Sequence, residues 1–290
     1  MAGGLKEVRE RIGSVQNTMQ ITSAMKMVSA AKLRRAQDAI TRMRPYAEKI
    51  QSILANVSAT LDSSEGVFSQ ERAVKNALVV CITSDRGLCG AFNNNNIKIA
   101  NATVAANEEK GINTFVLPLG KKAVEAFTTS RPEGFEPVAI FADLNFDASS
   151  EVAEFVMNGY VKGQWDSVHI AYSKFKNAAV QIPMNEQFLP LVPEEGEENE
   201  VTSQVEYIFE PNREEIVENI LPNALKIQLY KALLDSHASE HGARMTAMHS
   251  ATENAGELLS ELKISYNKAR QAAITTEILE IVAGSEALEG

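Results

Sequence analysis

The last third of the chain carries an unbroken pattern of apolar and small residues, spaced alternately four and three positions apart. This spacing averages 3.5 residues, the period of a left-handed coiled coil rather than of a helix in a globular core. About 60 residues, roughly 223–283, predict a helix ~90 Å long, whereas a compact chain of 290 residues would be roughly 50 Å across. We therefore expect the helix to protrude and its seam to be covered. The seam comprises Leu234, Ala238, His241, Met245, Met248, Thr252, Ala255, Leu259, Leu262, Tyr266, Ala269 and Ala273.

A second helical stretch begins near the N-terminus and has the same alternation of three and four positions. Pro45 is expected to kink this helix or mark a joint, and residues 62–66 are expected to end it. Two such helices at opposite ends of the chain predict a long antiparallel coiled coil. The seam of this first helix comprises Leu5, Val8, Ile12, Val15, Met19 and Thr22.

The first seam changes character after Thr22. Carried forward, the register places Lys26 and Ser29 on the seam, while Ile21, Met25 and Val28 form a stripe beside it. We therefore expect the seam to shift or weaken there, and the helix to present a surface to something other than its mate.

The middle of the chain alternates between short apolar runs and helical segments, which predicts βαβ units. The fold class is therefore α/β, with a Rossmann-like domain and a largely parallel sheet. The expected boundaries are residues 1–61 for the first helix, 70–210 for the α/β domain and 211–290 for the last helix. The expected strands are 77–83, 113–117, 137–141, 167–175, 179–182 and 205–209, and the expected helices between them are 97–110, 121–129 and 149–162.

Charge is distributed unevenly along the chain. The net charge is -10, but residues 1–49 carry ten Lys and Arg against four Asp and Glu. A basic helix suits an acidic protein surface, nucleic acid or lipid head groups, and it also suits a merely solvated helix face. No apolar run approaches the ~18 residues of a membrane span, and the N-terminus lacks the apolar core of a secretory signal. We expect a cytoplasmic-type protein.

Candidate chemistry is sparse. Ser84–Asn93 follows the first strand and holds two glycines, but it matches neither GxGxxG nor GxxxxGK[ST]. A structural turn with a partner contact is favoured over nucleotide binding. His237 and His241 are spaced i, i+4 without the glutamate of a zinc protease, so helix packing is favoured over a metal site. Cys81 is expected to be core. We predict no catalytic residue, no metal and no cofactor.

The end of the last helix is apolar on more than one face. Ile274, Ile278 and Val282 belong to this tip, and Gly284 is expected to end the helix. An exposed apolar tip indicates that another protein encloses it.

Six stretches of the chain, ordered from end to end, resemble one family: the gamma subunit of F-type ATP synthase, bacterial type. The resemblance covers essentially the whole chain. The stretches are Ser14–Thr18, Ile21–Val28, Pro45–Ala47, Ser84–Asn93, Tyr266–Thr275 and Glu280–Gly284.

The resemblance implies a central rotor shaft. Both terminal helices would wind together inside a hexamer of three alpha and three beta subunits. The α/β domain would form a foot with the epsilon subunit on the membrane c-ring. Proton flow would turn ring and shaft, and the MgATP sites would belong to beta and alpha. The chain would be peripheral, on the cytoplasmic face of the bacterial plasma membrane, with no nucleic acid partner.

The resemblance also implies contact residues by motif match. The foot contacts to epsilon and the c-ring would be Arg86, Gly87, Tyr207 and Glu210. The contacts between rotor and stator would be Met25, Lys26, Arg244, Arg270, Gln271, Thr275, Glu277 and Glu280.

Two other functions stay open from the residues. One is a stand-alone α/β nucleotide-binding enzyme with helical arms, against which the missing phosphate loop argues. The other is a coiled-coil adaptor that binds nucleic acid through residues 1–49, against which the lack of interleaved aromatic residues and the acidic balance of the chain argue.

Overall fold

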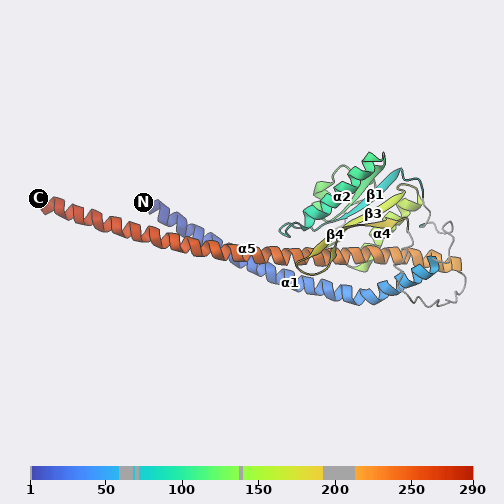
Figure 1. The fold of residues 1–290 in the computed structure, drawn as a ribbon, viewed down its shortest axis with the longest axis horizontal. Helices are drawn as coiled ribbons and strands as arrows, with labels where there is room; N and C mark the ends of the chain where they lie inside the picture. The colour runs from blue at the N-terminus through green and yellow to red at the C-terminus, as the bar shows by residue number, and fades with distance from the viewer. Residues whose placement is uncertain (1, 59–67, 69–71, 137–139, 192–212, 290) are drawn as a thin grey trace. The chain divides into compact units, whose positions relative to one another are not determined.

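The computed structural model describes residues 2–58, 68, 72–136, 140–191 and 213–289. The two long helices, α1 (Ala2–Ser58) and α5 (Arg213–Glu289), stand at the ends of the chain, and a small α/β assembly lies between them in the sequence (Figure 1). The chain divides into two compact units, and each long helix contributes to both. One unit comprises residues 1–30 with 244–290, and the other comprises residues 31–243.

The sheet of the second unit has the strand order β2-β1-β3-β4. Strands β1 (Asn76–Ile82), β2 (Asn113–Leu119) and β3 (Ser167–Phe175) are parallel. The edge strand β4 (Gln181–Leu189) runs antiparallel to β3. The predicted fold class, α/β with a largely parallel sheet, is therefore confirmed.

Helices cover both faces of this sheet, which explains why β1 is apolar without alternation. Helices α2 (Phe92–Glu109) and α3 (Lys121–Ala126) pack on one face, where Cys81 and Ala171 meet Ala100 and Ala123. Helix α4 (Phe146–Val161) and the early part of α5 pack on the other face (Figure 1). The larger core on that face includes Leu78, Val80, Ile82, Val152, Val156, Tyr160, Leu225, Leu229 and Leu233.

Several predicted boundaries are wrong. Ile140 and Phe141 were expected in a strand but lie in a turn. Ile140 is nevertheless part of the core, so its apolar character reflects burial and not a strand. The strand expected at 179–182 continues to Leu189, whose side chain is fully buried. Residues 62–66, 137–139 and 205–209 lie outside the described residues.

Pro45 lies inside α1 at an exposed position, and the kink expected there stays a prediction. One expected helix end is wrong. Gly284 lies inside α5 and shows no positive φ, so it does not act as a left-handed cap.

The seam positions of the first unit are the shielded ones on both helices. On α5, Met248, Ala255 and Leu259 are buried, while most residues between them are exposed. On α1, Thr22 is buried, and its Oγ1 lies 2.8 Å from Oγ1 of Thr252. These buried positions fall on the predicted seams.

The expected shift of the first seam does not occur. Ser29 is only 2% exposed, in register with Thr22, and its hydroxyl donates to the Met25 carbonyl. The neighbouring stripe faces outward instead, with Ile21 60% and Val28 58% exposed. The helix therefore keeps its seam and carries a separate apolar surface beside it.

One group of buried and half-buried polar side chains joins α5 to β3 and β4. Tyr172 donates to Oε2 of Glu186 over 2.7 Å, and Gln228 donates to Oε1 of the same carboxylate over 2.8 Å. Asp235 lies nearby and is 7% exposed. Burial raises the pKa of Asp235 to about 6, and Glu186 adds to the rise, although Lys231 and other cations oppose it.

Replacing Gly159 by Ala is expected to destabilise the chain, because a Cβ there would overlap the Trp165 indole. The indole is fixed by its Nε1–H, which donates to the Val156 carbonyl over 2.9 Å. We expect the free energy of unfolding to fall by about 1–3 kcal/mol in urea denaturation. Gly256→Ala is the matched control, since its Cβ meets nothing within 4 Å. Equal midpoints for both variants would contradict the packing.

Asp235→Asn is expected to stabilise the chain in a pH-dependent way. An aspartate with an ordinary pKa of 3.8 in the unfolded chain and about 6 in the folded chain favours folding at low pH. That contribution is lost as the pH rises through about 6. We therefore expect the free energy of unfolding to increase by up to about 3 kcal/mol at pH 8, and to change little at pH 3.5.

Thermal denaturation at the two pH values measures this effect, with the exposed Asp38→Asn as control. Destabilisation by Asp235→Asn at pH 8 would show that the carboxylate is stabilised by its cationic neighbours.

Candidate functional site

The loop after β1 occupies the place where Rossmann-like folds bind ligands, at the carboxyl ends of the parallel strands. Its polar groups are engaged within the chain. The Asn93 side chain accepts from the Ser84 backbone N–H over 2.9 Å and donates to the Ser84 hydroxyl over 2.9 Å. Asp85 Oδ1 accepts from the Lys121 N–H, at the start of α3, over 3.0 Å. A phosphate would have to displace these internal bonds.

Close backbone packing adds to the hydrogen bonds that fill this end of the sheet. A Cβ on Gly120, whose φ is 95°, would overlap the carbonyl of Thr83. The Thr83 hydroxyl accepts from the Ala123 N–H over 2.8 Å. Loop, strand end and helix start are therefore in direct contact, which favours a structural turn over a nucleotide site.

Two predicted foot contacts lie at the tip of the same loop. Arg86 and Gly87 are exposed, and the Arg86 carbonyl accepts from the Ser84 hydroxyl over 2.7 Å. Leu88 follows with a φ of 64° and is 66% exposed. A non-glycine residue in left-handed backbone conformation is uncommon and marks a constrained turn. The other two foot contacts, Tyr207 and Glu210, lie outside the described residues.

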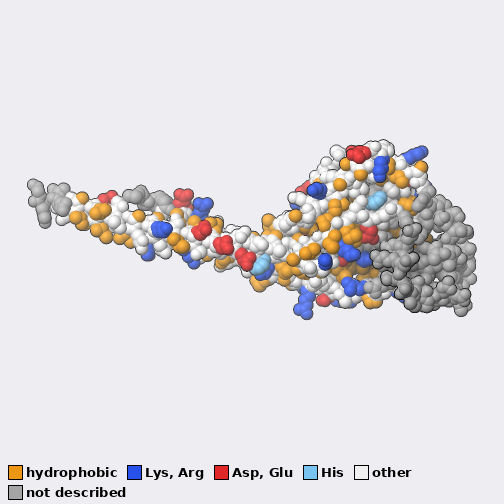
Figure 2. Space-filling model, viewed as in Figure 1, with side chains coloured by type: hydrophobic (Ala, Val, Ile, Leu, Met, Phe, Trp, Pro, Cys, Tyr) orange, Lys and Arg blue, Asp and Glu red, His pale blue; other side chains and the backbone are white. Residues whose placement is uncertain are grey.

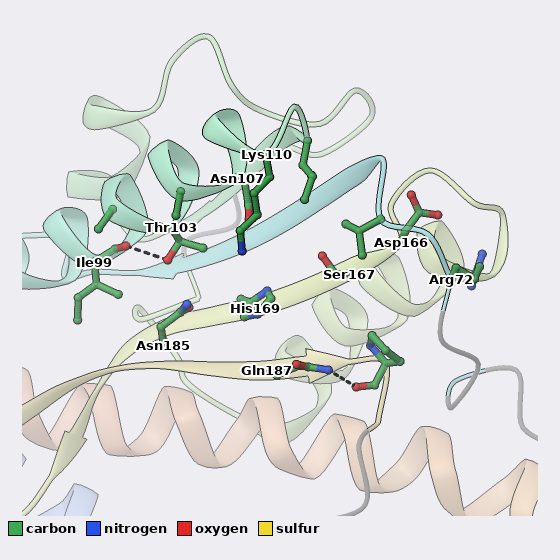
Figure 3. A pocket seen from close by; sticks show the side chains of 15 residues that line it. Arg72, Ile99, Thr103, Asn107, Lys110, Asp166, Ser167, His169, Asn185 and Gln187 are labelled. Atoms are coloured by element: carbon green, nitrogen blue, oxygen red, sulfur yellow. Dashed lines mark hydrogen bonds between the residues drawn. The ribbon is translucent and has the colours of Figure 1, made fainter. Parts of the chain in front are cut away.

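A cavity of about 740 Å³ lies at the opposite end of the sheet, between the later turns of α2 and the strands β3 and β4. Figure 3 shows Thr103 and Asn107 reaching in from α2, and His169, Asn185 and Gln187 from the strands. Sequence reasoning missed this cavity. Its signal was the alternation of polar residues in two neighbouring strands, which places them on one face of the sheet.

The lining of this cavity does not form an evident catalytic set. Burial lowers the pKa of His169, so its imidazole stays neutral. Asp166 accepts from the backbone N–H groups of Lys75 and Asn76 over 2.9 and 3.1 Å, and so serves as a structural cap. A polar concave surface of this kind suits recognition rather than proton transfer.

The histidine pair of α5 is packed inside the second unit. The Nε2 atoms of His237 and His241 lie 3.1 Å apart, and the His237 ring stacks on Phe141. Burial, together with the charge of Lys32, lowers the pKa of His237 to about 4. The buried contact between the two rings agrees with the packing interpretation. Within the described ranges, no three His, Cys, Asp or Glu side chains converge on a possible metal position.

Cys81 is core, as predicted. It is fully buried in β1, and burial raises the pKa of its thiol to about 12. A protonated, inaccessible thiol is chemically inert.

The predicted rotor contacts fall into two groups. Met25 and Lys26 lie half-buried on α1, and Lys26 Nζ is 3.2 Å from Nδ1 of His249 on α5. Arg244 differs from the others because it is only 7% exposed. The second group is exposed near the end of α5 and comprises Arg270, Gln271, Thr275, Glu277 and Glu280.

Large apolar side chains accompany these polar ones at the end of α5. Ile274, Ile278, Leu279, Ile281 and Val282 are all exposed. Figure 2 shows hydrophobic side chains along this end of the helix. The exposure matches the expectation of an apolar tip. In the part of the chain that the structure describes, no helix combines the length and apolar character that a bilayer crossing requires.

Comparison with known proteins gives matches along the whole chain. The ATP synthase family profile matches residues 4–288. A protein of Flavobacterium psychrophilum named ATP synthase gamma chain is 53% identical over 287 residues, which cover 99% of each chain. The ATP synthase gamma chain of Cytophaga hutchinsonii is 52% identical over 293 residues, which cover 98% of each chain.

Solved structures share the fold. One is a chain of the Euglena gracilis mitochondrial ATP synthase, in a structure of its OSCP, F1 and c-ring. It matches with a TM-score of 0.66 and 21% identity, covering 99% of this chain and 95% of its own. Another comes from the central stalk and c-ring of the Tetrahymena thermophila mitochondrial ATP synthase. It matches with a TM-score of 0.58 and 24% identity, covering 80% of this chain and 99% of its own.

The resemblance drawn from six short stretches is confirmed by relatives that share about half of their residues with this chain from end to end. This protein belongs to the ATP synthase gamma-chain family.

Proposed function

We propose that this chain is the central-stalk rotor of a bacterial F-type ATP synthase and couples rotation of the c-ring to ATP synthesis and hydrolysis. The observation that carries the proposal is the match to gamma chains over nearly all residues. The long helices, the apolar tip and the plugged α/β crevice fit a mechanical part. The chain itself holds no active site and no cofactor, and the MgATP sites lie on the alpha and beta subunits.

The shaft in this proposal is an antiparallel coiled coil of α1 and α5. Thr22 meets Thr252, and four residues further along α1, Lys26 meets His249, which lies three residues earlier on α5. From the first contact to the second, the residue number rises on α1 and falls on α5, which supports an antiparallel direction. Buried small residues such as Ser29 and Ala255 allow close approach of the backbones.

Partners follow the same division of the chain. Residues 1–61 and 211–290 form the shaft inside the hexamer of alpha and beta subunits, and residues 70–210 form the foot. Arg86, Gly87, Tyr207 and Glu210 contact epsilon and the c-ring. The chain is held at the cytoplasmic face of the bacterial plasma membrane through the c-ring, without nucleic acid.

Rotor contacts must be exchangeable, because each lasts for only part of a turn. On α1, Met25 and Lys26 present an apolar and a cationic group beside the exposed Ile21 and Val28, and we assign this surface to the acidic lever segment of beta. Arg244 acts near the same region. Each dwell requires only a difference in stabilisation between rotary positions. The tip contacts are Arg270, Gln271, Thr275, Glu277 and Glu280.

Cysteines at Thr22 and Thr252 test the shaft. Because the two hydroxyls are in contact, the variant carrying Thr22→Cys and Thr252→Cys is expected to form an intrachain disulfide on mild oxidation. In a complex reconstituted with alpha and beta, ATP turnover should stay within about twofold, since both helices turn together. Thr22→Cys with Ser260→Cys is the control, because Ser260 is exposed eight residues further along α5. Equal crosslinking of both pairs would refute the register.

Alanine at both Arg270 and Gln271 tests the tip. We expect the complex to assemble with normal subunit ratio while its ATP turnover falls about tenfold, as for the loss of one charge-assisted contact. Reconstitution, native mass measurement and ATP hydrolysis assays provide the readout. The control replaces Lys263 and Lys268, two exposed residues of the same helix, by alanine. Unchanged turnover in the first variant would remove the pair from the mechanism.

A further inference from the structure

His249 on α5 lies between two charged side chains of the first unit. Its Nδ1 is 3.2 Å from the Nζ of Lys26 on α1, and its Nε2 is 3.6 Å from Oε1 of Glu253, one turn along α5. Within the described ranges, these two are the charged groups in contact with the imidazole. The His249 side chain is 50% exposed, so protons reach it from solvent.

The protonation state of the imidazole follows from the chemistry of lysine. An ammonium group has three donors and no acceptor, so Nδ1 must accept the hydrogen bond. The contact with Lys26 therefore requires a neutral ring whose proton sits on Nε2, on the side of Glu253. A second proton would turn Nδ1 into a donor and place two cations in contact. It would also create an ion pair between the ring and Glu253.

We propose that His249 is a positioning residue for Lys26: its neutral ring holds the Lys26 ammonium against the shaft, and its protonated ring releases it. The proposal rests on the assignment of Lys26 as a rotor contact. Released, the ammonium points away from α5 and is available to an acidic surface of the stator. Rotor contact at this position is then stronger at low pH than at high pH.

Protonation of His249 acts on Lys26 by changing which groups the ring can bind. In the neutral state Lys26 binds Nδ1, and Glu253 faces an N–H at 3.6 Å, too far for a strong bond. In the charged state Glu253 gains a cationic partner on its own helix, one turn away. In the charged state Nδ1 no longer accepts from Lys26, and the lysine changes its place. Since all three groups are solvated, the effect on contact strength is about twofold to threefold.

The first experiment uses the full-length chain alone and reads Lys26 directly. With ¹³C-labelled lysine, we expect the Cε signal of Lys26 to move between pH 8 and pH 5.5. Lysine does not titrate in this range, whereas histidine in water takes up its proton near pH ~6.5. The exposed Lys268 serves as the internal reference. In His249→Gln, a neutral acceptor at every pH, the movement should disappear. A stationary Lys26 signal in the native chain would overturn the proposal.

The second experiment uses the complex reconstituted with alpha and beta and measures ATP turnover from pH 8 to pH 5.5. Lys26→Gln is expected to change turnover about twofold more at pH 5.5 than at pH 8 in the His249 background, and equally at both pH values with His249→Gln. His249→Lys, permanently charged, should reproduce the low-pH behaviour at pH 8. Equal effects of Lys26→Gln at both pH values with His249 present would overturn the proposal.

The two readouts separate the possible failures. A Lys26 signal that moves with pH, together with turnover that ignores Lys26→Gln altogether, would show that the histidine positions the lysine but that Lys26 is not a rotor contact. The assignment of Lys26 would then fail, and with it the functional part of the inference.

Discussion

Close approach of two helices depends on the small side chains at their contact positions. Thr22, Ser29 and Ala255 are buried there, while bulkier neighbours such as Ile21 and Val28 point away. The two threonine hydroxyls are bonded: Thr22 donates to the Met19 carbonyl or to its partner threonine, and Thr252 Oγ1 lies 2.7 Å from the Met248 carbonyl. A polar group satisfied in this way lies in an apolar seam without the penalty of an unpaired donor. The exposed apolar side chains of α1, among them Ile21 and Val28, lie outside this seam.

The α/β unit shows how a ligand-binding architecture serves a structural purpose. The carboxyl ends of β1 and β2, where doubly wound folds hold phosphates, are joined by Asn93, Asp85 and Thr83 through bonds of 2.8 to 3.0 Å. These contacts tie the loop to the starts of α2 and α3.

Periodic features were predictable from the sequence and long-range ones were not. The seam of α5 was predicted correctly because every seam position requires a residue that can be shielded from water. Strand β1 was predicted correctly because both of its faces are covered, which makes its sequence continuously apolar. Ile140 was misassigned because burial in a core does not distinguish a loop from a strand. The seam was expected to shift or weaken where the register reaches Lys26 and Ser29, yet the stem of a lysine can lie along an apolar surface with its head in water. The contact with His249 depends on the register between two helices more than 200 residues apart in sequence, which no local pattern contains. The contacts proposed for Arg270 and Gln271 involve other chains, so the fold of this chain does not test them.

The threonine pair has a consequence for motion along the helix axis. If α5 slid by one heptad against α1, Thr22 would face Met245 or Leu259 instead of Thr252. The Thr22 hydroxyl would then face an apolar side chain in place of its hydroxyl partner. Polar residues at seam positions fix the register of coiled coils for this reason. The 2.8 Å contact between the two hydroxyls therefore opposes axial slippage of α5 against α1.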